Sequence, residues 1–124
     1  MSVLRRANGQ WTLLETHSTL PAPRADNTVA AVRVFEGRVM VSNRGHDSIA
    51  VFAIEGERLR PLGIFPTPGP VPRDFYPLRD GRILIAHQEG DVTLARLGEA
   101  GFIPLSHLDV RGAVCVLPFE GATA

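Results

Sequence analysis

The sequence lacks several features that would assign a function directly. It has one cysteine, Cys115, so no disulfide can form within the chain, which fits a reducing compartment. No apolar run approaches the ~18 residues of a membrane-spanning helix, and residues 1–6 lack the apolar stretch of a signal peptide. Thirteen basic side chains balance thirteen acidic ones, and no basic run is longer than Arg5-Arg6. Nucleic-acid binding, which depends on phosphate neutralisation, therefore has little support. These absences predict a cytoplasmic protein that binds neither membrane nor nucleic acid.

Sequence motifs for cofactors, metals and nucleophilic serines are also missing. No Walker or dinucleotide glycine pattern occurs. His87 and His107 are lone histidines at predicted strand ends, with no second ligand at metal-binding spacing. Ser42 and Ser48 lack the glycines that flank a nucleophilic serine. Cys115 lies in an apolar stretch and is expected to be a buried core thiol. We expect no cofactor and no metal.

Alternation of apolar residues is the main pattern that the sequence does contain. Residues 39–41 and 49–51 alternate as strands do, and the intervening residues 43–47 contain Gly45, which can take the positive φ of a tight turn. No segment keeps apolar residues at helical spacing over ten or more positions. The pattern predicts an all-β protein.

A repeat of turn-like tripeptides extends this prediction. Gly37 and Gly81 are 44 residues apart, and Gly121 follows 40 residues later. Asp47 and Asp91 match at the same 44-residue distance. A period of this length that holds four short strands is typical of a β-propeller blade.

The repeat divides the chain into blades of four antiparallel strands. We predict a single partial propeller domain over residues 1–124, with two whole blades and flanking strands. Residues 1–17 form the end of one blade and residues 113–118 the inner strand of a further blade. The predicted strands are 28–35, 38–43, 48–54 and 58–64 in the first whole blade (27–65), and 73–78, 82–87, 91–97 and 102–108 in the second (72–108).

Residues 42–52, Ser-Asn-Arg-Gly-His-Asp-Ser-Ile-Ala-Val-Phe, resemble the signature hairpin of the β-propeller lactonase family, the 6-phosphogluconolactonase-like proteins. Residues 72–75 resemble the next inner strand of that family, 114–116 its C-terminal strand, and 18–21 also fit. The resemblance covers almost the whole chain but only the C-terminal part of the family's usual length. It implies a propeller with a central pocket in which a sugar lactone is hydrolysed.

The resemblance also implies roles for four residues. Lactone hydrolysis needs a base for the attacking water and donors for the developing oxyanion. Arg44 and Arg73 would bind the anionic group of the substrate, since guanidinium groups bind phosphate or carboxylate bidentately. His46, as a base or a donor, and Asp74 would be catalytic. The alternatives are that Arg44 and His46 only serve the turn, and that the charged residue of the Arg73-Asp74 pair that faces a neighbouring blade takes part in an ion pair between blades. Ala31 stands where relatives commonly have a glutamate, so part of the site would be lost.

Two functions therefore stay open. The chain resembles a lactonase of the 6-phosphogluconolactone type, active only within an assembled propeller. Alternatively, it is a catalytically inactive, truncated relative that acts as an oligomeric binding or scaffold module, or a gene fragment with no selected role. Both functional interpretations predict an anionic, sugar-like ligand. Both also predict that the open blade faces are covered by further copies of the chain or by a complementing propeller fragment.

Overall fold

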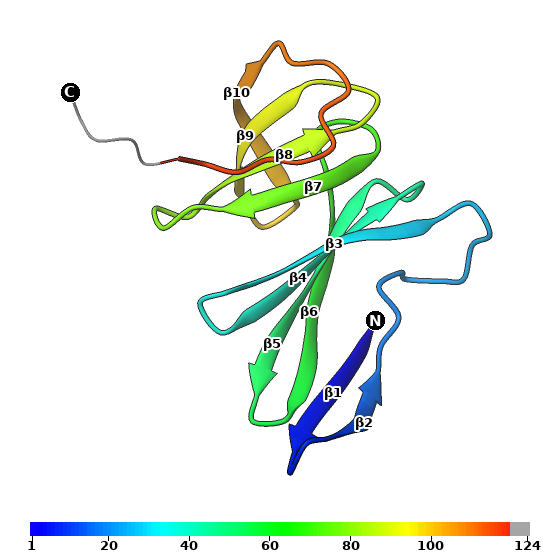
Figure 1. Ribbon diagram of the computed structural model, residues 1–124. Coiled ribbons are helices and arrows are strands. Elements are labelled where there is room, and N and C mark those ends of the chain that lie inside the picture. Colours follow the sequence, from blue (N-terminus) through cyan, green and yellow to red (C-terminus); the bar gives the residue numbers. More distant parts are fainter. Residues whose placement is uncertain (120–124) are drawn as a thin grey trace.

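The computed structural model describes residues 1–119, and these residues fold into strands and loops without a helix (Figure 1). A two-stranded sheet at the N-terminus is followed by two four-stranded sheets. The N-terminal sheet holds β1 (Ser2–Ala7) and β2 (Gln10–Thr16). The first four-stranded sheet holds β3 (Thr28–Phe35), β4 (Arg38–Arg44), β5 (Ser48–Glu55) and β6 (Arg58–Pro66); the second holds β7 (Pro72–Pro77), β8 (Arg82–His87), β9 (Val92–Leu97) and β10 (Phe102–Leu108).

Each four-stranded sheet is an antiparallel meander in which every strand pairs with its neighbour in sequence. This arrangement confirms the predicted all-β fold with propeller-type blades. No observed end of these eight strands differs from its predicted position by more than two residues. The β1–β2 hairpin turns at Asn8 and Gly9, which both have positive φ.

The predicted inner strand over 113–118 is not formed. Residues 109–119 instead follow an irregular path across β7 (Figure 1), and none of the residues 1–119 pairs with them as a strand. A strand requires a neighbouring strand for its backbone hydrogen bonds, and this segment has no such strand within the described chain; a backbone bond to the second sheet runs from Gly112 N to the Gly90 carbonyl of a turn. For the same reason Cys115 is exposed, and the expectation of a buried core thiol was wrong. The last repeated tripeptide, 119–121, extends beyond the described residues.

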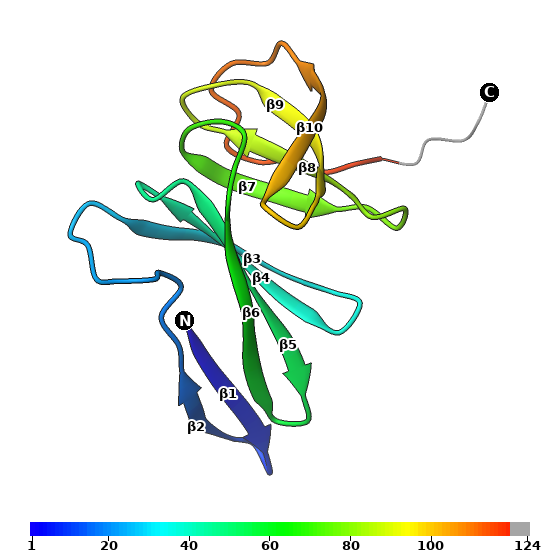
Figure 2. The same ribbon diagram turned by 180° about the vertical axis from the view of Figure 1, so that it is seen from behind.

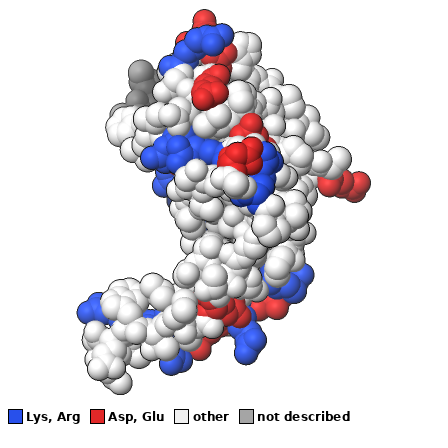
Figure 3. All heavy atoms as spheres, turned by 90° about the vertical axis from the view of Figure 1, so that its right-hand side faces the viewer, with Lys and Arg blue, Asp and Glu red and all other residues white. Residues whose placement is uncertain are grey.

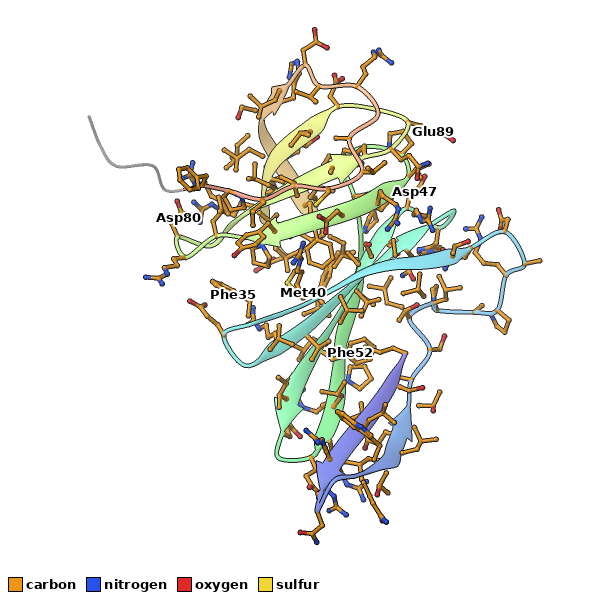
Figure 4. The ribbon with its side chains drawn as sticks, in the orientation of Figure 1. Phe35, Met40, Asp47, Phe52, Asp80 and Glu89 are labelled. Carbon is orange, nitrogen blue, oxygen red and sulfur yellow. The ribbon has the colours of Figure 1, made fainter. Side chains whose placement is uncertain are left out.

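The two four-stranded sheets pack face to face, and alternation along the strands decides which side chains meet. Figure 4 shows Met40 and Phe52 on opposite sides of the first sheet. Met40 joins the buried core between the two sheets, whereas Phe52 belongs to a second cluster beside the N-terminal hairpin. The core between the sheets consists of Met40, Ile49, Val51, Phe75, Ile83, Ile85, Ala95 and Phe102.

The inner strand of the first sheet is open where a preceding blade would pack. Val32 pairs with Val41, and Phe75 pairs with Ile85 at the corresponding place in the second sheet. The first sheet covers Phe75 completely, but Val32 is 51% exposed and Val34 68% exposed. The β1–β2 hairpin lies beside β6 at the outer part of the sheet (Figures 1 and 2) and leaves this surface free.

Candidate functional site

The turn between β4 and β5, residues 43–47, carries the signature residues and packs closely on the segment that precedes β3. Gly45 has φ 111°, a conformation that favours glycine. A Cβ atom at this position would lie 1.9 Å from the carbonyl oxygen of Asp26. The turn can therefore approach residues 26 and 27 only because position 45 has no side chain.

Asn43 anchors the turn to the incoming segment. This buried side chain accepts a hydrogen bond from Thr19 Oγ1 at 2.7 Å, and its Nδ2 donates to the Thr19 carbonyl at 2.7 Å. Nδ2 also donates to Ser48 Oγ at 3.1 Å. Asn43 thus holds together three segments that are distant in sequence: the N-terminal connector, β4 and β5.

Asp47 anchors the same turn to the outgoing connector, residues 67–71. Its Oδ1 accepts hydrogen bonds from the backbone N–H groups of Gly45 and Val71, both at 3.1 Å. Its carbonyl accepts from Thr67 N at 2.9 Å and from Thr67 Oγ1 at 3.1 Å. Figure 4 shows Asp47 at the edge where this turn meets the second sheet. These contacts give Asp47 a structural role.

Arg44 and His46 lie on this one turn, as predicted. Arg44 Nη1 donates to Gln88 Oε1 of the neighbouring sheet at 3.3 Å, and Arg44 Nε is buried without a partner among residues 1–119. No carboxylate within the described chain pairs with Arg44. The His46 backbone N–H donates to Asn27 Oδ1 at 3.1 Å, and His46 Nδ1 lies 2.7 Å from Ser48 Oγ.

Asp74 forms an ion pair between the two sheets, which was the structural alternative for this residue. Arg33 Nη2 lies 2.9 Å and 3.1 Å from the two Asp74 oxygens, and Arg33 Nε donates to the Phe75 carbonyl at 3.0 Å. Val116 N also donates to Asp74 Oδ2 at 2.9 Å. The guanidinium group of Arg33 lies over the ring of Tyr76, with Arg33 Cζ 5.3 Å from the ring centre. The side chain of Asp74 is only 8% exposed, so its carboxylate is occupied and shielded.

Arg33 was missed by the sequence analysis, although one basic residue in the otherwise apolar strand 28–35 was a usable signal. Arg73, by contrast, forms no ion pair in the described chain. The strand register passes from the Pro72–His87 pair to the Asp74–Ala86 pair, so Arg73 is the extra residue of a bulge.

Ala31 occupies the position in the first sheet that Asp74 occupies in the second. Ala31 directly precedes Val32, which pairs with Val41. Asp74 directly precedes Phe75, which pairs with Ile85 at the corresponding place of the second sheet. Ala31 packs against the core between the sheets, and its N–H donates to Ser42 Oγ at 3.0 Å. The second sheet therefore has a carboxylate at this position and the first sheet does not.

The turn between β8 and β9 contains a buried histidine that the sequence analysis treated as an ordinary strand-end residue. His87 lies 44 residues after Asn43, and its Nδ1 is 3.1 Å from the Pro70 carbonyl of the incoming connector. His87 Nε2 and Asp91 Oδ1 are buried and have no partner among residues 1–119. Burial lowers the pKa of His87, and this effect exceeds the opposing influence of the Pro70 carbonyl and the nearby carboxylates.

Figure 3 shows basic and acidic side chains intermingled on the side that it presents, without an extended surface of one sign. In the described part of the chain, no helix has the length and apolar character required to cross a bilayer. The cytoplasmic location stays a prediction.

Comparison with known proteins places the chain among propeller proteins. A protein of Staphylococcus saprophyticus is 39% identical over 100 residues, which cover 76% of this chain and 29% of the relative. A protein of Lactococcus lactis is 38% identical over 120 residues, which cover 89% of this chain and 35% of the relative. The chain thus spans about a third of the length of these curated relatives.

Solved structures agree on the fold. A protein from Lactobacillus plantarum superposes with a TM-score of 0.79 and 27% identity, over 92% of this chain and 37% of that one. A periplasmic gluconolactonase of Pseudomonas aeruginosa superposes with a TM-score of 0.76 and 22% identity, over 90% of this chain and 34% of that one. Residues 1–117 match the family described as "Lactonase, 7-bladed beta-propeller". The chain therefore belongs to the seven-bladed β-propeller lactonase family, of which it represents a part.

Proposed function

We propose that this chain supplies the anion-binding wall of a lactone-hydrolysing site, within a propeller completed by further blades. The substrate would be a sugar lactone that carries a phosphate or carboxylate, of the 6-phosphogluconolactone type. The family supports the reaction class. The observation that carries the proposal for this chain is Arg44, a partly buried cation that has no acidic partner in the described chain.

An unpaired arginine in such a place is costly unless it has a ligand. Partial burial removes water from the guanidinium group, and this cost is normally offset by a carboxylate. Within residues 1–119, the side-chain hydrogen bond of Arg44 goes to the neutral Gln88 and supplies no opposite charge. An oxyanion would provide both the missing charge and the acceptor atoms for a bidentate contact.

The base for lactone hydrolysis would come from blades outside this chain. Asp74 already accepts hydrogen bonds from Arg33 and Val116, and Asp47 holds the connector. Ala31 cannot transfer a proton. Assembly with a second copy or with a complementing propeller piece would cover Val32 and Val34 and bring further side chains to the pocket.

A second function, binding without hydrolysis, is supported by the residues at positions 74 and 31. If the engaged Asp74 and the alanine at position 31 mean that no base is present even after assembly, the chain would be an oligomeric module that binds an anionic sugar without hydrolysing it. The two functions share the anion site at Arg44 and differ only in turnover.

Hydrolysis of 6-phosphogluconolactone separates the two functions. We expect hydrolysis above the spontaneous rate in those fractions that light scattering identifies as a discrete assembly. Arg44→Ala should lower this rate by about 10- to 100-fold, because a hydrogen bond to a charged group contributes ~1.5–3 kcal/mol. Arg38→Ala is the matched control, since Arg38 is exposed at the opposite end of β4. An assembly that binds phosphate but leaves the spontaneous rate unchanged would select the binding module.

A further inference from the structure

The hydrogen bonds around Asn43 have a defined direction that begins at a backbone carbonyl. The carbonyl oxygen of Thr19 can only accept, so the Asn43 atom 2.7 Å from it must be the Nδ2 amide nitrogen. Asn43 Oδ1 then faces Thr19 Oγ1 at 2.7 Å, and the threonine hydroxyl donates to it. The orientation of the Asn43 amide is therefore determined by its partners.

This orientation decides how the Ser48 hydroxyl is used. The second N–H of Asn43 Nδ2 points to Ser48 Oγ at 3.1 Å, so Ser48 accepts this bond. Ser48 is fully buried, and its own proton needs an acceptor. Within residues 1–119, the acceptor within reach is His46 Nδ1, at 2.7 Å.

We infer that the neutral ring of His46 carries its proton on Nε2, so that it presents a hydrogen-bond donor and not a proton acceptor to a ligand. The opposite tautomer would place a proton on Nδ1 and leave the buried Ser48 hydroxyl proton without an acceptor. His46 Nε2 has no partner in the described chain, and it is not among the buried polar atoms, so it is accessible to a ligand.

The consequence is that Arg44 and His46 both offer hydrogen-bond donors. Arg44 contributes a cationic guanidinium group, and His46 contributes Nε2–H two residues later on the same turn. Such a pair recognises an oxyanion, either a carboxylate or a phosphate, and it is unsuited to removing a proton from water. The assignment of a ligand rests on the proposed function, whereas the tautomer rests on the hydrogen bonds alone.

Nitrogen-15 NMR of the imidazole rings tests the tautomer directly in the unmodified chain. At about pH 8.5, where an ordinary imidazole is neutral, we expect His46 Nε2 to show the full shift of an N–H nitrogen and Nδ1 that of an unprotonated one. His107, an exposed histidine, is the internal control and should show an exchange-averaged mixture. An averaged His46 like that of His107, or a proton on Nδ1, would overturn the inference.

Variants and a ligand separate this inference from the proposed function. Ser48→Ala should return the His46 nitrogen shifts to the averaged values of His107, because the fixed donor to Nδ1 is removed. Addition of inorganic phosphate should then shift Nε2 more than Nδ1 in the unmodified chain. A fixed Nε2–H tautomer without any response to phosphate would support the tautomer and contradict the anion site. A phosphate response from a His46 ring that carries its proton on Nδ1 would contradict the tautomer and support the anion site.

Discussion

The β4–β5 turn of the first sheet and the β8–β9 turn of the second have the same place in the repeat, and are called here the first and the second turn. Their buried polar groups are paired to different degrees. In the first turn, Asn43 binds the incoming segment and Asp47 binds the outgoing connector. In the second turn, His87 binds the incoming connector through Pro70. Asp91, the counterpart of Asp47, has a buried Oδ1 without a partner in the described chain. Both turns are bonded to the segments that enter and leave them, because Gly112 N of the outgoing segment donates to the Gly90 carbonyl at 3.2 Å. The difference lies in the carboxylates, of which Asp47 is paired and Asp91 is not within the described chain.

The difference shows that a blade of this protein depends on the connectors that enter and leave it. Buried polar groups cost free energy unless they are paired. Val71 of the outgoing connector pairs with Asp47, whereas residues 109–119 are hydrogen-bonded to the second turn only at Gly90 in the described chain, and they do not form the next inner strand. We infer that packing of a further blade would place this segment so that one of its backbone N–H groups reaches Asp91, as Val71 reaches Asp47.

The largest expected effect distinguishes the glycines of the two turns. Gly45→Ala should destabilise the fold by more than about 3 kcal/mol, because a side chain at φ 111° would overlap the Asp26 carbonyl. Gly90→Ala should cost about 1 kcal/mol or less, since its Cβ would lie 3.3 Å from the His87 Cβ. Urea unfolding at one fixed protein concentration measures both. Equal losses would show that the first turn is not the more closely packed of the two.

The carboxylates of the two turns should also differ. Asp47→Ala removes the acceptor for two backbone N–H groups and should cost about 1–3 kcal/mol. Asp91→Ala removes an acceptor without a partner and should change the unfolding free energy by no more than about 0.5 kcal/mol. Asp47→Asn is the control for the left-handed backbone at this position, because asparagine tolerates φ 57° and keeps an acceptor oxygen. A costly Asp91→Ala would mean that Asp91 already has a partner.

The smallest effect concerns pH. Burial lowers the pKa of His87 below its ordinary value of 6.5, so the unfolded chain binds more protons in this range. The stability contribution of neutral His87 is fully present above about pH 6.5 and declines as the pH falls toward the folded pKa. His87→Asn, which copies the residue of the first turn, should remove this part of the slope. Unfolding free energies between about pH 7 and pH 5 compare the two proteins, and parallel curves would contradict the burial of a neutral His87.

Most of the fold could be predicted from local patterns. Alternation and the 44-residue repeat located the eight strands of the two complete sheets, because strand length and turns are local properties. The strand at 113–118 and the burial of Cys115 could not be predicted in this way. Both depend on a neighbouring strand, and residues 1–119 do not provide one.

Part of the candidate site could likewise be predicted from local sequence, whereas the rest depends on how the sheets pack. Arg44 and His46 share one short turn, so their common position was predictable from the sequence. The pairing of Asp74 with Arg33 joins residues 41 positions apart, and the bond from Val71 to Asp47 joins residues 24 positions apart. Such contacts arise only when the sheets pack, and no local pattern specifies them. The direction of the hydrogen bond to His46 likewise depends on Thr19, from a separate segment.

The central claim is that the turn at 43–47 binds an oxyanion through Arg44. Titration of the purified chain with inorganic phosphate, followed by calorimetry or NMR, tests this claim without requiring turnover. We predict saturable binding that Arg44→Ala weakens by about tenfold or more and that Arg38→Ala leaves unchanged. Equal phosphate affinity in the unmodified chain and in Arg44→Ala, both with the same fold, would contradict the account.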